Sequence, residues 1–290
     1  MSKARAAILA AALVAIAPLG AAGQSLPRAS DGKPDLSGIW QAVNSAAWNI
    51  LPHSAEAGVP GGLGVVEGNE IPYTQAAAAT QRNNFANRAK LDPETQCYLP
   101  GVPRATYMGL PFQIVQTPAQ ITLLYEYDHT VRNVFMNSPH PRGPIEFWMG
   151  DSRGSWDGDT LVVDVVHFND QTWFDRAGNH HSEALHVIER YTLIDRDHIN
   201  YEVTIEDPKV FTRQWKMSMP LYRRLDRDMR LLDYECVAFN EALRPDPAVV
   251  EECRGISAAK SLPTSILPLR VAKASHRRGA FSVYSPTAVL

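Results

Sequence analysis

The sequence lacks the short motifs that mark nucleotide and metal chemistry in many enzymes. It has no glycine-rich phosphate loop, no dinucleotide fingerprint, no His-Glu-x-x-His and no paired-cysteine spacing. Its net charge is only −3, and nothing indicates the clustered basic surface that a nucleic-acid partner requires. We therefore predict no organic cofactor and no nucleic-acid partner.

Long hydrophobic runs are confined to the N-terminus. A positively charged stretch precedes an apolar run over residues 6–19, and Ala21 and Gly23 then place small residues where a signal peptidase cleaves. This pattern predicts a secretory signal peptide over residues 1–23. No later stretch approaches about 18 uncharged apolar residues, the length of a membrane span. We expect a periplasmic or secreted protein without a stable membrane anchor.

Cysteine is scarce, with three residues in the chain. An oxidising compartment allows two of them to pair and leaves one over. We favour a bond between Cys97 and Cys236, because both lie in strand-like or strand-flanking sequence, which leaves Cys253 unpaired. Three unpaired thiols are the alternative.

The mature chain divides into three parts by composition. Residues 24–35 are a leader without periodicity, residues 36–245 carry the regular pattern, and residues 246–290 read as a disordered or loosely attached tail. Within the central part, residues 52–72 are rich in proline and glycine and predict a long loop. Residues 73–91 contain no helix breaker and predict one external helix with a thin apolar stripe.

Most of the central part follows the two-residue alternation of β-strands. The hairpin signals are a turn near Asp128-His129 and the run Trp156-Asp157-Gly158-Asp159, where Asp-Gly suits a type I′ turn. Further alternating runs begin at Ile199 and Phe211, and a last strand is expected from about residue 229 to 239. At least eight short strands with one helix predict an all-β fold, and we favour an antiparallel β-barrel.

Alternation also predicts which polar side chains face the barrel interior. His167 should end an inward row after Leu161, Val163 and Val165. Arg213 should lie on an apolar face between Phe211 and Trp215, where a guanidinium is costly unless it is paired. It would then either form a structural ion pair with Asp164 or Glu183, or anchor an anionic ligand group.

His181 and Glu183 are two residues apart, so they would share a face of an extended strand about 7 Å apart. This spacing suits acid–base chemistry, with the imidazole moving a proton and the carboxylate tuning it. Solvated groups at a loop-to-strand junction are the alternative. A divalent metal held by His167, His181 and Glu183 is a weaker possibility, because no standard ligand spacing is present. We predict no metal site.

Two resemblances add to this interpretation. Gly38-x-Trp40 is similar to the first-strand signature of lipocalins and other calycin barrels, in which the Trp plugs one barrel end. The runs DLSGIW (residues 35–40), WDGDTLVV (156–163) and HSEAL (181–185) resemble those of a family of uncharacterised exported bacterial proteins. That likeness implies a shared fold and a shared site around His181, Glu183 and Arg213, but no activity.

Two functions remain open. In the first, the barrel is a cofactor-independent lyase, isomerase or hydrolase that uses His181, Glu183 and His167, with Arg213 as the anchor. In the second, it is a carrier that only binds its ligand. In both, the interior should bind a hydrophobic or aromatic small molecule through further residues, namely Tyr125, Tyr127, Tyr201 and Trp215. The abundance of ionisable groups favours the enzyme.

Overall fold

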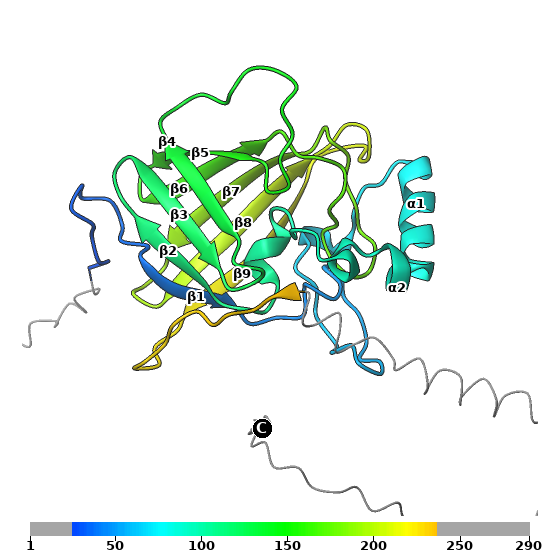
Figure 1. Cartoon of the computed structure of the whole chain (residues 1–290), viewed down its shortest axis with the longest axis horizontal. Helices are drawn as coiled ribbons and strands as arrows, with labels where there is room; N and C mark the ends of the chain where they lie inside the picture. Colours follow the sequence, from blue (N-terminus) through cyan, green and yellow to red (C-terminus); the bar gives the residue numbers. More distant parts are fainter. Residues whose placement is uncertain (1–24, 237–290) are drawn as a thin grey trace, which may run out of the picture. The chain divides into compact units, whose positions relative to one another are not determined.

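The computed structural model describes residues 25–236, and its central feature is a closed barrel of nine strands in chain order (Figure 1). The strands are β1 (Gly38–Ala42), β2 (Phe112–Gln116), β3 (Gln120–Tyr125), β4 (Val131–Met136), β5 (Asp151–Asp157), β6 (Thr160–Val166), β7 (His186–Leu193), β8 (His198–Glu206) and β9 (Trp215–Arg223). The predicted all-β barrel is therefore confirmed.

The barrel is not antiparallel throughout, as the sequence-based prediction had it. β4 and β5 run parallel, whereas the other neighbouring pairs are antiparallel. Strand direction cannot alternate around a closed ring with an odd number of strands, so nine strands require at least one parallel pair. A parallel pair needs a crossover of a dozen or more residues. The segment 137–150, which lies between β4 and β5, is that crossover.

The strand directions give the two barrel ends different loops. One end is closed by three short hairpins, which join β2 to β3, β5 to β6 and β7 to β8. The opposite end, here called the long-loop end, carries residues 43–111, 167–185 and 207–214. At the β5–β6 hairpin Gly158 has a φ of 59° and Asp159 does not share the positive value, so the turn follows the type II′ pattern rather than the expected I′.

The first strand contributes a tryptophan to the barrel core near the short-hairpin end. Trp40 is fully buried and its Nε1 donates a hydrogen bond to the Leu36 carbonyl at 2.8 Å. The Arg223 guanidinium lies 4.2 Å from the centre of the Trp40 ring and donates to the Ser37 carbonyl at 2.6 Å. These contacts join the start of β1 to the end of β9, where the barrel closes.

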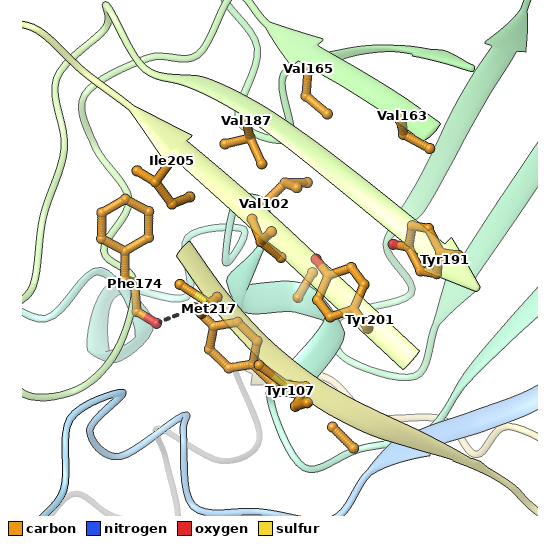
Figure 2. Packing of buried hydrophobic residues seen from close by; sticks show 14 of the residues in the cluster. Val102, Tyr107, Val163, Val165, Phe174, Val187, Tyr191, Tyr201, Ile205 and Met217 are labelled. Atoms are coloured by element: carbon orange, nitrogen blue, oxygen red, sulfur yellow. Dashed lines mark hydrogen bonds between the residues drawn. The ribbon is translucent and has the colours of Figure 1, made fainter. Parts of the chain in front are cut away.

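The long-loop end of the barrel is filled by the 3₁₀ helix η3 (Arg104–Tyr107), all four residues of which are buried. In Figure 2, Val102 and Tyr107 lie among Tyr201 and Met217 of the barrel strands. The Tyr107 hydroxyl donates to the Phe174 carbonyl at 2.9 Å, which fixes the helix against the 167–185 loop.

An ion pair lies inside the barrel. Arg132 on β4 and Glu189 on β7 are both buried, and the guanidinium donates two hydrogen bonds to the carboxylate. Glu189 also accepts from the hydroxyls of Tyr191 at 2.9 Å and Tyr201 at 2.6 Å, while Arg132 donates to Ser152 Oγ at 2.9 Å. The buried charges are thus paired and hydrogen-bonded, as burial requires.

The helix predicted over residues 73–91 is present in two pieces on the outside of the barrel (Figure 1). They are α1 (Gln75–Ala86), which begins where Thr74 Oγ1 accepts from the Ala77 N–H at 3.2 Å, and α2 (Arg88–Leu91). Two further 3₁₀ turns are η1 (Glu67–Asn69) and η2 (Pro93–Gln96).

No helix in the part of the chain that the structure describes is long and apolar enough to span a membrane.

Two strand predictions are wrong. The run that begins at Phe211 is not one strand: β9 starts only at Trp215, and Phe211 forms an isolated bridge with Tyr73. The strand expected from about residue 229 is absent up to Cys236, the last described residue; this stretch makes one isolated bridge, between Tyr234 and Tyr127. The remainder, residues 237–239, lies outside the described residues, as does the whole of the predicted tail, residues 246–290.

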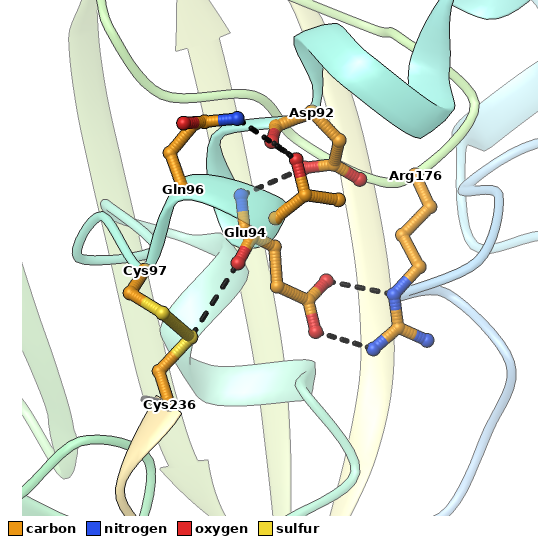
Figure 3. Close-up of a disulfide and its surroundings, with 7 residues drawn as sticks. Asp92, Glu94, Gln96, Cys97, Arg176 and Cys236 are labelled. Atoms are coloured by element: carbon orange, nitrogen blue, oxygen red, sulfur yellow. Dashed lines mark hydrogen bonds and ion pairs between the residues drawn. A yellow bond between two sulfur atoms is a disulfide. The ribbon is translucent and has the colours of Figure 1, made fainter. Parts of the chain in front are cut away.

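The expected disulfide is present (Figure 3). Cys97 and Cys236 are bonded, with their Cα atoms 5.3 Å apart, and the bond joins residues 139 positions apart in sequence. It ties the end of the described chain to the turn after η2 at the long-loop end. Cys253 lies outside the described residues.

Replacing Glu189 with Gln should lower the free energy of unfolding by about 3–5 kcal/mol, because it leaves the buried Arg132 guanidinium without its counter-charge. Urea denaturation of the two proteins measures the difference. Glu202→Gln, on the outer face of β8, is the matched control and should stay within about 0.5 kcal/mol of the parent. A loss below 1 kcal/mol for Glu189→Gln would show that the pair contributes no more than a surface pair.

Replacing Cys236 with Ser should destabilise the oxidised protein by about 2–5 kcal/mol, since the bond constrains a long loop in the unfolded chain. Thermal or urea denaturation gives the value, and Cys253→Ser serves as the cysteine control. Equal stability of the Cys236→Ser variant and the parent under oxidising conditions would contradict the structure.

Candidate functional site

A cavity of about 310 Å³ lies at the long-loop end, outside the barrel. Its walls come from residues 48–59, from α1 and α2 with the turn that follows, and from the loop at Arg176 and Ala177. We call it the helix-side cavity. A second cavity of about 410 Å³ shares Asn49, Phe85 and Ala177 with it, so the two adjoin.

One wall of the helix-side cavity is a tryptophan covered by an arginine. The Arg176 guanidinium lies 4.0 Å from the centre of the Trp48 ring, a distance at which cation–π attraction is effective. Its Nε and Nη2 donate to the two carboxylate oxygens of Glu94 at 2.7 and 2.5 Å (Figure 3). Arg176 is therefore held in place by both the Trp48 ring and the Glu94 carboxylate.

The acidic groups of this wall are neutralised by a buried arginine. Arg104 is 1% exposed and donates to Asp92 Oδ1 at 3.2 Å and to Glu94 Oε2 at 2.7 Å. Burial would raise the pKa of Glu94, but the hydrogen bonds and charges of Arg176 and Arg104 outweigh it and hold that pKa below its ordinary value. Glu94 is therefore ionised at neutral pH.

The helical side of the cavity repeats the pairing of a cation with a ring. The Arg88 guanidinium lies 4.3 Å from the centre of the Phe85 ring, and its Nη1 donates to the Phe85 carbonyl at 2.8 Å. Phe85 is 44% exposed and lines the cavity, so its ring offers an apolar surface there.

Asp175 fixes the loop that contains Ala177, which lines both cavities. It is fully buried, and its Oδ2 accepts from Ile50 N at 2.9 Å and from Asn179 Nδ2 at 2.6 Å. Its Oδ1 accepts from Ala177 N at 2.9 Å and Asn179 N at 3.2 Å. Burial nevertheless raises the pKa of Asp175 to about 6, the backbone and side-chain donors opposing the shift.

The predicted pair of His181 and Glu183 is not assembled as expected. No strand forms between Trp173 and His186, so the two side chains have no common strand face. His181 is buried: its Nδ1 lies 2.9 Å from the Ser182 carbonyl and its Nε2 lies 2.7 Å from Thr172 Oγ1. Because a carbonyl only accepts, Nδ1 carries the proton and Nε2 accepts from the hydroxyl. Burial lowers the pKa of His181 and favours this neutral form.

Glu183 and Arg213 face solvent. The Glu183 carboxylate pairs with Lys209, and Arg213 is exposed and donates to the Gln214 carbonyl at 3.5 Å. The prediction that Arg213 lies on an apolar strand face is therefore wrong, because the strand begins two residues later. The ion pair within the barrel exists, but it is formed by Arg132 and Glu189.

His167 does not end the inward row of β6. The strand stops at Val166, and His167 adopts a φ of 63°, so its side chain leaves the alternation and lies 3.1 Å from the Pro141 carbonyl. Its ring centre is 6.2 Å from that of His140, whose Nδ1 lies 2.6 Å from Asp151 Oδ2. Within residues 25–236, no group of three or more His, Cys, Asp or Glu side chains could hold a metal ion.

The predicted aromatic ligand contacts are buried but not brought to one cavity wall. Tyr125 and Tyr201 lie in the barrel core beside the Arg132–Glu189 pair, and Tyr201 is bonded to it. Trp215 is buried in the cluster at the long-loop end, where its ring centre is 5.6 Å from that of Phe174. Tyr127 is buried beyond the end of β3, 5.4 Å from the Tyr234 ring centre.

Ser152 lies in a Gly-x-Ser-x-Gly spacing, Gly150 to Gly154, which in hydrolases places a nucleophile on an exposed strand-to-helix turn. Here Ser152 is within β5, is buried, and accepts from Arg132. It is therefore a structural residue of the barrel wall.

The sequence-based interpretation missed the residues of the helix-side cavity. Trp48 and Arg176 lie in loops without periodicity, so no pattern marks them as neighbours. One signal was available: Phe85 is the single large apolar residue in an otherwise polar and alanine-rich helix, and it projects outward.

Comparisons of the chain with protein-family models, with curated proteins and with solved structures found no match.

The raised pKa of Asp175 predicts the direction in which the stability of the protein changes with pH. The folded protein holds a proton there up to about pH 6, whereas the unfolded chain releases it near pH 3.8. Its stabilising contribution is therefore complete below pH 3.8 and is lost as the pH rises through about 6, a change of about 3 kcal/mol. Urea denaturation from pH 4 to 7 should show the parent gaining stability over Asp175→Asn as the pH falls. A constant difference between the two proteins would contradict it.

Proposed function

We propose that this chain is an exported protein that binds a small apolar or partly aromatic molecule in the helix-side cavity. The observation that carries the proposal is the pair of rings that line the cavity, the half-buried Trp48 and the exposed Phe85. A volume of about 310 Å³ falls in the range of small-molecule sites. Export is inferred from the charged, apolar and small-residue pattern of residues 1–23.

The walls of this cavity are fixed before any ligand arrives. Arg176 is held between Trp48 and Glu94, and Asp175 ties the 175–179 loop to Ile50. The Cys97–Cys236 bond follows directly after η2, which supplies Glu94. A fixed cavity loses little conformational freedom when it binds, which favours affinity.

Catalysis of the kind expected from the sequence needs a histidine that can exchange protons with a ligand. His181 is buried with both ring nitrogens engaged, and Glu183 is paired with Lys209. The geometry therefore favours the carrier over the lyase, isomerase or hydrolase, and we rest the proposal on binding.

The neutral fluorophore N-phenyl-1-naphthylamine tests the proposal, because it is aromatic and its emission rises in apolar surroundings. We expect saturable binding with one site per chain. Trp48→Ala should weaken it about tenfold, since the variant removes a ring surface from the cavity.

Phe135→Ala is the matched control, because Phe135 is also an exposed ring covered by an arginine, Arg153 at 5.0 Å, but it lies on β4 away from the cavity. The Phe135→Ala variant should bind the fluorophore with the same affinity as the parent. Absence of saturable binding, or equal losses in the two variants, would refute binding in this cavity.

A further inference from the structure

We propose that the ligand of the helix-side cavity is a planar aromatic molecule with a negatively charged group, and that Arg88 contacts this group. The inference rests on the proposed function, since it names the ligand class of the same cavity. It follows from the charges in the cavity walls and from which of them already have partners.

Two of the charged groups are compensated within the protein. Arg176 donates two hydrogen bonds to Glu94, and Asp92 is paired with the buried Arg104. Neither needs a ligand group to balance its charge. Glu94 also accepts from Arg104, so the carboxylates and guanidiniums here form one closed network.

Arg88 is different. It lines the cavity and forms no ion pair with any residue from 25 to 236. A guanidinium has five N–H donors, and the structure assigns one of them, Nη1, to the Phe85 carbonyl. That bond and the Phe85 ring at 4.3 Å fix the group in place, which leaves donors for the paired oxygens of a carboxylate, sulfonate or phosphate.

Glu56 is the remaining acidic residue of the wall. It lies at the tip of a short hairpin, where its backbone pairs with Val59, and no side-chain hydrogen bond or ion pair to the rest of the described chain holds its carboxylate. A cation fixed by two contacts is preorganised for a partner, whereas a carboxylate without such contacts can turn to solvent. The walls therefore favour an anion bound at Arg88. The negative charge of Glu56 repels that anion and lowers its affinity.

The two rings of the cavity walls favour an anion that has an aromatic part. Each ring, Trp48 and Phe85, is paired with a guanidinium, at 4.0 and 4.3 Å from the ring centres. A planar ligand can contact these surfaces and direct its charged group to Arg88, the unpaired one of the two cations.

Two probes that share one fluorophore separate charge from shape: 1-anilinonaphthalene-8-sulfonate, which is anionic, and the neutral N-phenyl-1-naphthylamine. We expect the sulfonate to bind the full-length protein more tightly than the neutral probe at low salt. Arg88→Gln should weaken the sulfonate about tenfold, the scale of one charged hydrogen bond, and affect the neutral probe much less, because the neutral probe loses only packing against the side chain. Glu56→Gln should tighten the sulfonate more than the neutral probe.

Arg82→Gln is the control, since Arg82 is an exposed arginine of α1 that does not line the cavity. It should bind both probes as the parent does. Equal affinities for the two probes, with no effect of Arg88→Gln, would overturn the anionic ligand class and leave binding intact. If neither probe binds, the proposed function itself fails, and this inference fails with it.

Discussion

The carboxylate of Glu94 holds the long-loop end together. It lies on η2 and accepts hydrogen bonds from Arg104, which belongs to the helix that fills the barrel, and from Arg176, which belongs to the cavity wall. One buried acidic group thus joins the barrel interior to the surface site. Without Glu94, Arg104 would keep only its bond to Asp92, and the half-buried Arg176 would lose its carboxylate partner, so the position of the cavity wall depends strongly on this side chain.

The barrel interior and the cavity have different roles as a result. The interior contains η3 and the pair of Arg132 and Glu189, whose charges are hydrogen-bonded to each other within the fold. The cavity lies outside the barrel, against α1 and α2, where guanidinium and ring surfaces remain accessible. Polar residues inside a barrel are therefore not by themselves a sign of a ligand there.

The sequence predicted the features that depend on local periodicity, namely strands and hairpins. It predicted few of the features that depend on contacts between distant segments. The alternation at Ile199 and the glycine of the β5–β6 turn located strands and hairpins correctly, because strand faces follow a two-residue period. Arg213 was misplaced because β9 begins at Trp215, four residues later than expected, and His167 because its positive φ ended the alternation.

The cavity residues could not be found in this way. Trp48, Phe85 and Arg176 come from three separate segments, and only the folded chain brings them together. No periodic pattern records such proximity. The cysteine pairing was accessible because only three pairings of three cysteines exist.

The disulfide also determines how the chain can respond to mechanical force. The covalent loop from Cys97 to Cys236 encloses β2 to β9 and leaves β1 outside it. A pull on the two ends of the described chain can therefore peel β1 from its neighbours β2 and β9 and extend the residues before Cys97. The other eight strands are shielded from that tension, which passes through the sulfur–sulfur bond instead.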